Sequence, residues 1–300
     1  MFTASTFGRV AGGLVAALLL AAPAQAQDLL RELEVQTTDS LRRAYVTATF
    51  KGTRVINGHS VETPGQGSML FLISHRFGML NSGAYEFFGL DQATIRLGLE
   101  YGLTDRLAVG VGRSSLEKTL DGFVKYKALR QSSGPRPIPV SVTLLATSAL
   151  STLRFQPRPE RSTRSRFTYS YQALLARKFS PRLSVQLMPT LLHRNYVPLR
   201  RDQNDVYALG AAGRQKLTKR LALTAEYYYL LPGNTADDYR NSLALGFDIE
   251  TGGHVFQLHF TNSQGMIEKF FVPQTTGNFF DGDIYFGFNI ARAFQLRSQK

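Results

Sequence analysis

Apolar and polar residues alternate with a period of two through much of this 300-residue chain. In the segment 284–290 (IYFGFNI), Ile284, Phe286, Phe288 and Ile290 alternate with tyrosine, glycine and asparagine. Successive side chains of a β-strand point to opposite faces, so such a segment has one apolar face and one polar or small face. The same alternation occurs at 95–101, 107–112, 243–249 and 255–260. The chain is therefore predicted to be all-β.

The predicted strands are close to ten residues long, the length that a tilted strand needs to cross a membrane. Soluble β-sandwiches, the main alternative, use strands of about five or six residues. About twelve segments qualify: 68–76, 92–101, 106–114, 119–130, 138–150, 166–178, 182–192, 205–216, 220–230, 240–250, 253–262 and 283–294.

Short and long links largely alternate between these segments. The short ones are 104–105, 180–181, 218–219 and 251–252. The long ones are 77–91, 151–165, 194–204, 231–239 and 263–282. Tight periplasmic turns, long outer loops and an even number of strands are typical of bacterial outer-membrane barrels. Residues 68–294 are therefore predicted to form a single antiparallel transmembrane β-barrel of about twelve strands, with long outer loops and short periplasmic turns.

The first 26 residues have the pattern of a cleaved signal peptide. Arg9 precedes an apolar stretch at 10–22, and Ala24-Gln25-Ala26 is a small-x-small cleavage site. The apolar stretch is shorter than the roughly 20 residues that a membrane-spanning helix needs. We predict export from the cytoplasm, an N-terminal periplasmic or plug segment at 27–67, and a C-terminal tail at 295–300.

Several strings resemble an uncharacterised family of outer-membrane β-barrel proteins, the domain of unknown function numbered five-seven-seven-seven. They include TFKGTRVINGHSVE (49–62), LISHRFG (72–78), ETGGHVFQLHFTNSQGMIEKFF (250–271) and DGDIYFGFNI (281–290). The resemblance covers most of the chain after the signal peptide. It implies a barrel in a Gram-negative outer membrane. The family has no established activity, so no catalytic residue is carried over.

Polar residues on the predicted inner faces are candidates for lining a lumen, because barrel interiors are polar. They are Arg96, Glu100, Glu226, Asp248, Gln257, His259 and Asn289. In a channel, Arg96 and the acids would act as selectivity groups. Three glycines on the same faces, Gly98, Gly110 and Gly112, leave part of the wall without side chains, and we hypothesise that residues 44–62 lie against that wall as a plug.

The formal charge of the chain is +13, and one predicted outer loop is markedly basic. The basic patch consists of Arg154, Arg158, Arg161, Arg164 and Arg166. Guanidinium groups bind lipopolysaccharide phosphates well. The patch has two interpretations, anchoring among anionic lipids or capture and steering of anions. Export argues against a nucleic-acid partner.

Enzymatic interpretations have little support. The absence of cysteine excludes disulfides and cysteine-based catalysis or zinc binding, and the five histidines do not show metal-ligand spacing. No metal or cofactor is predicted. His259, followed by Thr261 and Asn262, loosely resembles the histidine and hydroxyl pairing of outer-membrane phospholipases. A nucleophile needs a base and an orienting group together, and no such set can be assigned.

The sequence thus favours an outer-membrane barrel that acts as a narrow channel or translocates small polar or anionic solutes. The alternative is a non-conducting structural or binding barrel, plugged by its N-terminal segment, with a periplasmic partner. A lipid-acting enzyme is a distant third hypothesis. The predicted partners are outer-membrane lipid, lipopolysaccharide and the barrel-assembly machinery. That machinery recognises a last strand that ends on an aromatic residue. Phe294 has the parity expected of this residue, but Arg292 interrupts the apolar face of the strand.

Overall fold

The computed structural model describes residues 43–154, 162–197, 202–233, 239–251 and 254–297. The predicted signal peptide at 1–26 and the basic-patch members Arg158 and Arg161 lie outside the described residues. Among the described residues, 43–45 and 132–137 form a small separate unit, in which β1 (Ala44–Tyr45) pairs antiparallel with β6 (Ser132–Ser133). All other described residues form the barrel unit.

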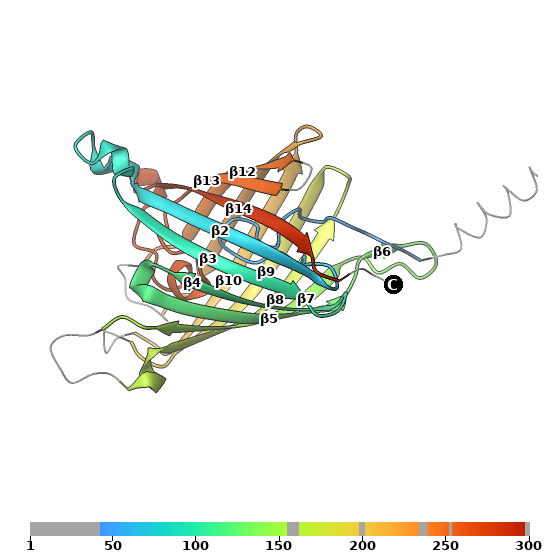
Figure 1. The fold of residues 1–300 in the computed structure, drawn as a ribbon, viewed down its shortest axis with the longest axis horizontal. Helices are drawn as coiled ribbons and strands as arrows, with labels where there is room; N and C mark the ends of the chain where they lie inside the picture. The colour runs from blue at the N-terminus through green and yellow to red at the C-terminus, as the bar shows by residue number, and fades with distance from the viewer. Residues whose placement is uncertain (1–42, 155–161, 198–201, 234–238, 252–253, 298–300) are drawn as a thin grey trace, which may run out of the picture. The chain divides into compact units, whose positions relative to one another are not determined.

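Twelve antiparallel strands form a closed barrel in the larger unit (Figure 1). They are β2 (Ser68–Met79), β3 (Ala93–Gly102), β4 (Leu107–Ser114), β5 (Thr119–Leu129), β7 (Ser141–Ser151), β8 (Phe167–Lys178), β9 (Leu183–Arg194), β10 (Asp205–Lys216), β11 (Leu221–Leu230), β12 (Ser242–Thr251), β13 (His254–Thr261) and β14 (Tyr285–Gln295). Each strand pairs with the next one of the barrel, and β14 pairs with β2 to close it, with Phe294 opposite Met69. The predicted fold class is confirmed.

Short helical turns occur in the links between strands. In the described parts of the links, five are 3-10 turns: η1 (Leu80–Ser82), η2 (Phe87–Gly89), η3 (Leu116–Lys118), η4 (Thr163–Arg166) and η5 (Phe279–Asp281). The link between β13 and β14 also contains the single-turn helix α2 (Glu268–Phe271). Among the described residues, no helix has the length and apolar character that crossing a membrane requires.

The outer wall of the barrel is apolar. Along β10, Tyr207 and Leu209 are exposed, whereas the alternating Val206, Ala208 and Gly210 are buried. The same alternation leaves large aliphatic side chains facing outward on other strands, with Val111 61 % and Leu144 50 % exposed. Exposed apolar area of this extent is costly in water and favourable in lipid.

Aromatic rings add to this outer face where β14 meets β2. The rings of Phe77 and Phe286 stack with their centroids 5.7 Å apart, and those of His75 and Phe288 stack at 4.9 Å. These pairs lie across the strand junction that closes the barrel, since His75 is opposite Phe288 in the register. Cross-strand aromatic pairs stabilise sheets, here at the contact between the first and last strands of the barrel.

Leu209→Arg should destabilise the folded barrel by about 2–4 kcal/mol, because the side chain lies near the middle of β10 on the outer face. Leu217→Arg, in the turn after the same strand and similarly exposed, should cost about 0–1 kcal/mol. Equilibrium unfolding in lipid vesicles measures both values. Equal costs at the two positions would contradict a membrane-embedded outer face.

Candidate gate in the barrel lumen

Residues 49–62 form a tight turn of chain that we call the inner hairpin. Its arms meet at a bridge between Arg54 and His59, and the amide of Val55 donates to the carbonyl of Gly58 at 2.9 Å. Its tip is fully enclosed. Gly58 has to be glycine here, because an added Cβ would lie 2.3 Å from the hydroxyl oxygen of Tyr228.

The carboxylate of Glu226, on β11, holds the tip of the inner hairpin. It accepts hydrogen bonds from the amides of Ile56 and Asn57 at 3.2 Å and from that of Gly58 at 3.0–3.1 Å. Hydrogen bonds to a charged acceptor are roughly twice as strong as neutral ones. This carboxylate therefore satisfies three consecutive main-chain donors that would otherwise be buried without a partner.

Lys125, on β5, holds the two arms of the inner hairpin together. Its ammonium group donates to the carbonyl oxygens of Thr53 at 2.9 Å, Ser60 at 3.1 Å and Glu62 at 3.0 Å. All three donors of the ammonium are used on main-chain carbonyls. Lys125 therefore binds main-chain carbonyl groups of the hairpin, whereas Glu226 binds main-chain amide groups.

Further contacts come from strands around the whole barrel. Gln186 on β9 accepts from the amide of Val61 at 2.9 Å and donates to the carbonyl of His59 at 2.8 Å. Gln257 on β13 donates to the carbonyl of Val55 at 2.8 Å, and Asn289 on β14 donates to that of Ile56 at 3.0 Å. Arg76 on β2 donates to the side chain of Asn57. A segment that reaches all these strands at once lies inside the barrel.

Apolar packing fills one side of the lumen. The side chains of Val55, Ile56 and Val61 belong to a buried cluster with inward-facing residues of the wall. The wall members are Phe123, Leu145, Leu174, Ala176, Met188, Leu192, Val206, Ala208, Ala212, Tyr228, Leu230 and Ala244. The inner hairpin is therefore held both by a packed core and by hydrogen bonds.

The link between β13 and β14 also enters the lumen. Met266, Ile267, Phe270, Phe271 and Val272 are all buried. The Phe271 ring lies 5.0 Å from that of Tyr228 on the inner face of β11. The prediction of a plain outer loop at 263–282 was therefore wrong in part, since its middle folds inward. Its apolar run MIEKFFV was the sequence signal for this packing.

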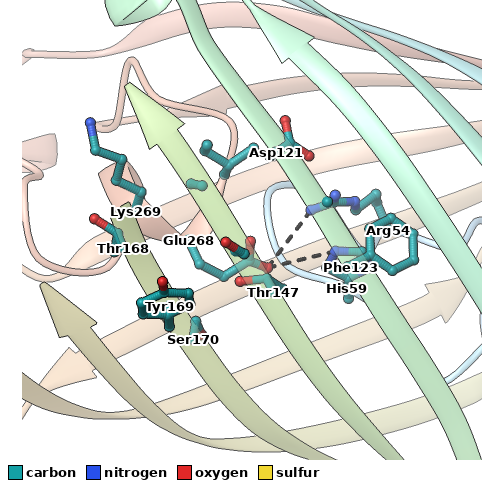
Figure 2. A pocket seen from close by; sticks show the side chains of 14 residues that line it. Arg54, His59, Asp121, Phe123, Thr147, Thr168, Tyr169, Ser170, Glu268 and Lys269 are labelled. Carbon is teal, nitrogen blue, oxygen red and sulfur yellow. Dashed lines mark ion pairs between the residues drawn. The ribbon is translucent and has the colours of Figure 1, made fainter. Parts of the chain in front are cut away.

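The folded-in link meets the inner hairpin at one ionic contact. The carboxylate of Glu268 lies 3.8 Å from the Arg54 guanidinium and 3.8 Å from the His59 imidazole (Figure 2). Burial lowers the pKa of His59 well below its usual value, and the positive charge of Arg54 lowers it further. Burial raises the pKa of Glu268, which Arg54 partly offsets. Arg54 is thus the charged partner of Glu268, and His59 is neutral near pH 7.

The junction is tightly filled. The cavity beside Arg54, His59 and Glu268 measures about 10 Å³, no more than one water-sized space. The His59 ring packs edge-on against Phe123, with centroids 4.5 Å apart. The inner hairpin and the link at α2 together occupy the lumen over the described residues.

The seven inner-face candidates are all buried. Glu226, Gln257 and Asn289 bind the inner hairpin, as described above. Asp248 pairs with Arg214, at 3.0 Å from its Nε, and accepts from Gln257 at 2.9 Å. Arg96 on β3 pairs with Asp121 on β5, and the Nε atom of Arg96 lies 2.9 Å from one carboxylate oxygen of Asp121.

Glu100 and His259, the other two candidates, are buried without hydrogen bonds. Neither carboxylate oxygen of Glu100 and neither ring nitrogen of His259 has a partner among the described residues. The pairing of His259 with a hydroxyl, which phospholipase chemistry would need, is therefore not formed. The role of the seven residues as selectivity groups stays a prediction.

The glycine wall does not seat the inner hairpin, contrary to the hypothesis from the sequence. An added Cβ at Gly112 would lie 2.3 Å from the guanidinium of Arg96, and one at Gly110 would lie 2.3 Å from the Phe123 ring. These glycines instead make room for large side chains of neighbouring strands. One of these side chains, Phe123, contacts the hairpin at His59.

Sequence reasoning missed three of the side chains that hold the inner hairpin: Arg76, Lys125 and Gln186. Arg76 lies in a predicted strand whose alternation is poor, because its inward positions include Leu70 and Leu72 and its outward positions include His75. Lys125 has the parity of the buried Phe123, which was the available signal.

The described members of the basic patch are Arg154, Arg164 and Arg166. Arg154 and Arg164 are exposed, and Arg166 is half-buried, donating to the carbonyl of Leu153 at 3.5 Å. The patch as a lipopolysaccharide contact stays a prediction.

A closed barrel with an apolar outer wall and a filled polar interior defines a membrane β-barrel protein. The chain belongs to the family described as "Membrane bound beta barrel domain (DUF5777)", whose model matches residues 50–294. It is an outer-membrane barrel, the setting in which such single-chain barrels of even strand number occur. Comparison with curated protein sequences gives no significant match.

Solved structures of similar fold include two porins and a channel. The NanC porin is 9 % identical, with 75 % of this chain and 98 % of that one covered, at a TM-score of 0.45. The KdgM porin is 10 % identical, with 76 % and 98 % covered and a TM-score of 0.42. An outer membrane channel from Pseudomonas putida F1 is 14 % identical, with 78 % and 97 % covered and a TM-score of 0.43.

Glu226→Gln should loosen the inner hairpin, because a neutral amide binds the three tip amides more weakly and brings two donors of its own. The chain has no cysteine, so Val55→Cys provides a single reporter at the buried tip. Maleimide labelling of this cysteine should be about 10-fold faster in the Glu226→Gln background.

Glu86→Gln is the matched control, since Glu86 lies in the β2–β3 link and makes no side-chain contact with the hairpin in the described residues. It should leave the labelling rate unchanged. If Glu226→Gln also leaves the rate unchanged, the carboxylate does not hold the hairpin.

Proposed function

We propose that this protein is an outer-membrane channel for small polar or anionic solutes that its own inner hairpin closes at rest. The observation that carries the proposal is that Glu226 holds the tip of the inner hairpin, and Lys125 and Gln186 hold its arms, inside a closed twelve-stranded barrel. A barrel of this size lies between the eight-stranded kind, filled by its wall side chains, and the open porins of sixteen or more strands. Its lumen is wide enough to need a filling.

The polar character of the contacts supports a gate that opens. The side chains that hold the hairpin are ionic or amide groups, which water can solvate when the hairpin leaves. They would then line a polar lumen of the kind that passes small solutes. In this view residues 27–67 form one N-terminal segment that closes the barrel from the periplasmic side.

A second candidate is the non-conducting barrel, and the apolar packing supports it. Val55, Ile56 and Val61 bury their side chains against the wall, as residues of a permanent core do. In this alternative the protein is a scaffold or binding barrel with a periplasmic partner. Neither candidate needs a catalytic residue or a cofactor.

Deletion of residues 46–62 should convert a silent barrel into a conducting one. Single-channel recording in planar bilayers measures this for the wild-type protein and the deletion variant. We expect discrete current steps only in the variant, since the deletion removes the hairpin and leaves the twelve strands. Heat-modifiable gel migration shows that both proteins are folded.

Two results would contradict the proposal. A folded deletion variant that carries no current would favour the non-conducting alternative. Equal steady currents in both proteins would mean that the hairpin does not close the lumen.

A further inference from the structure

A second cavity, at the end of the barrel where the long links lie, has a chemistry that the gate does not use. We call it the mouth cavity. It measures about 180 Å³ and shares only Thr168 and Lys269 with the lining of the junction cavity at Glu268. The side chains that carry its chemistry are Glu117, Ser151, Arg166, Arg194, Tyr196 and Lys269. The volume is sufficient for a small polyatomic ion with some of its water.

Arg194, the last residue of β9, is the feature that points to a ligand. It is 2 % exposed, yet its Nε and Nη1 atoms have no hydrogen-bond partner among the described residues. Buried guanidinium nitrogens are normally paired, so an unpaired set beside a cavity is an open binding position. Each of these two nitrogens can donate a charge-assisted hydrogen bond to an oxoanion.

The backbone holds this guanidinium in place. Its Nη2 atom donates to the carbonyl of Gln203 at 2.7 Å, and its main-chain amide donates to the carbonyl of Asn204 at 2.7 Å. The Asn204 side chain returns a hydrogen bond to the Arg194 carbonyl. The side chain is therefore preorganised, which lowers the entropy cost of binding a ligand.

The charges around the mouth cavity favour an anion. Lys269 pairs with Glu117 and lies over the Phe270 ring, with its Nζ 4.3 Å from the centroid. These two charges offset one another, and Arg194 keeps two nitrogens at the cavity that are unpaired within the described residues. The carboxylate of Asp202 acts on Arg194 electrostatically without a hydrogen bond to it.

We propose that the mouth cavity binds a small oxoanion on the free nitrogens of Arg194. The hydroxyl group of Thr168 lines the same space and can donate to one of its remaining oxygens. The site deepens the proposed function by naming a class of solute, and it rests on that function only for its role in transport. Binding itself requires no conductance.

Inorganic phosphate is the probe, titrated by calorimetry into the full-length folded protein in detergent at low chloride. Saturable binding is expected in the wild-type protein. Arg194→Gln should weaken it by about 10- to 100-fold, the loss expected for hydrogen bonds to a charged group. Arg194→Lys, which keeps the charge but not the planar guanidinium with its several N–H donors, should give an intermediate loss.

Arg164→Gln is the matched control, because it removes the same charge from an exposed arginine at the same end of the barrel. It should leave phosphate binding unchanged. Heat-modifiable migration establishes that each variant is folded. No saturable phosphate binding in the folded wild-type protein overturns the proposal, and so does an equal loss in Arg164→Gln and Arg194→Gln.

A second titration uses lipopolysaccharide, whose lipid phosphates share the same chemistry. Binding of lipopolysaccharide that falls in Arg164→Gln but not in Arg194→Gln, with no binding of free phosphate, assigns anion contact to the basic rim and refutes the cavity site. Because every titration is independent of current, phosphate binding by a non-conducting barrel would overturn only the proposed function.

Discussion

The filling of the barrel depends on how the main-chain polar groups of the inner hairpin are satisfied. A hairpin has few internal hydrogen bonds, and its remaining buried main-chain groups need partners from the wall. Here the wall supplies the partners: Glu226 accepts from three tip amides, and Lys125 donates to three carbonyls. Without such side chains, these main-chain groups of the hairpin would be buried without partners, at a cost in free energy.

This dependence explains the composition of the inner wall. Strands that faced only water could use any polar residue, whereas this wall has glutamine, asparagine, lysine and glutamate aimed at particular main-chain atoms. The apolar sector opposite Val55 and Ile56 adds close packing. The polar contacts specify where the hairpin sits, and the apolar contacts stabilise it there.

Two segments fill the lumen and contact each other: the inner hairpin and the β13–β14 link that contains α2. Glu268 belongs to the link, Arg54 to the hairpin, and their contact is buried. If either segment moves away, the charged side chain of the other, Arg54 or Glu268, is left buried without its ionic partner. The two segments are therefore energetically coupled, and displacement of one favours displacement of the other.

Much of the barrel could be predicted from the sequence, because a period of two and strand length are local properties. The twelve predicted segments coincide with the twelve barrel strands, for example 205–216 with β10 and 119–130 with β5 (Thr119–Leu129). The parity of Glu226 and Gln257 also placed them among the inner-face candidates. Their partners were not predictable, since they lie about 170 and 200 residues away in the chain. The inward course of α2 was missed for the same reason, as its place depends on Arg54 and Tyr228 rather than on its neighbours in sequence.

The most direct test of the central claim is hydrogen exchange of the inner hairpin in the lipid-embedded protein, followed by mass spectrometry. If Glu226 holds the tip inside the barrel, the amides of Ile56, Asn57 and Gly58 exchange as slowly as those of the barrel strands. Exchange of these amides as fast as that of the exposed β2–β3 link would show that the hairpin does not occupy the lumen.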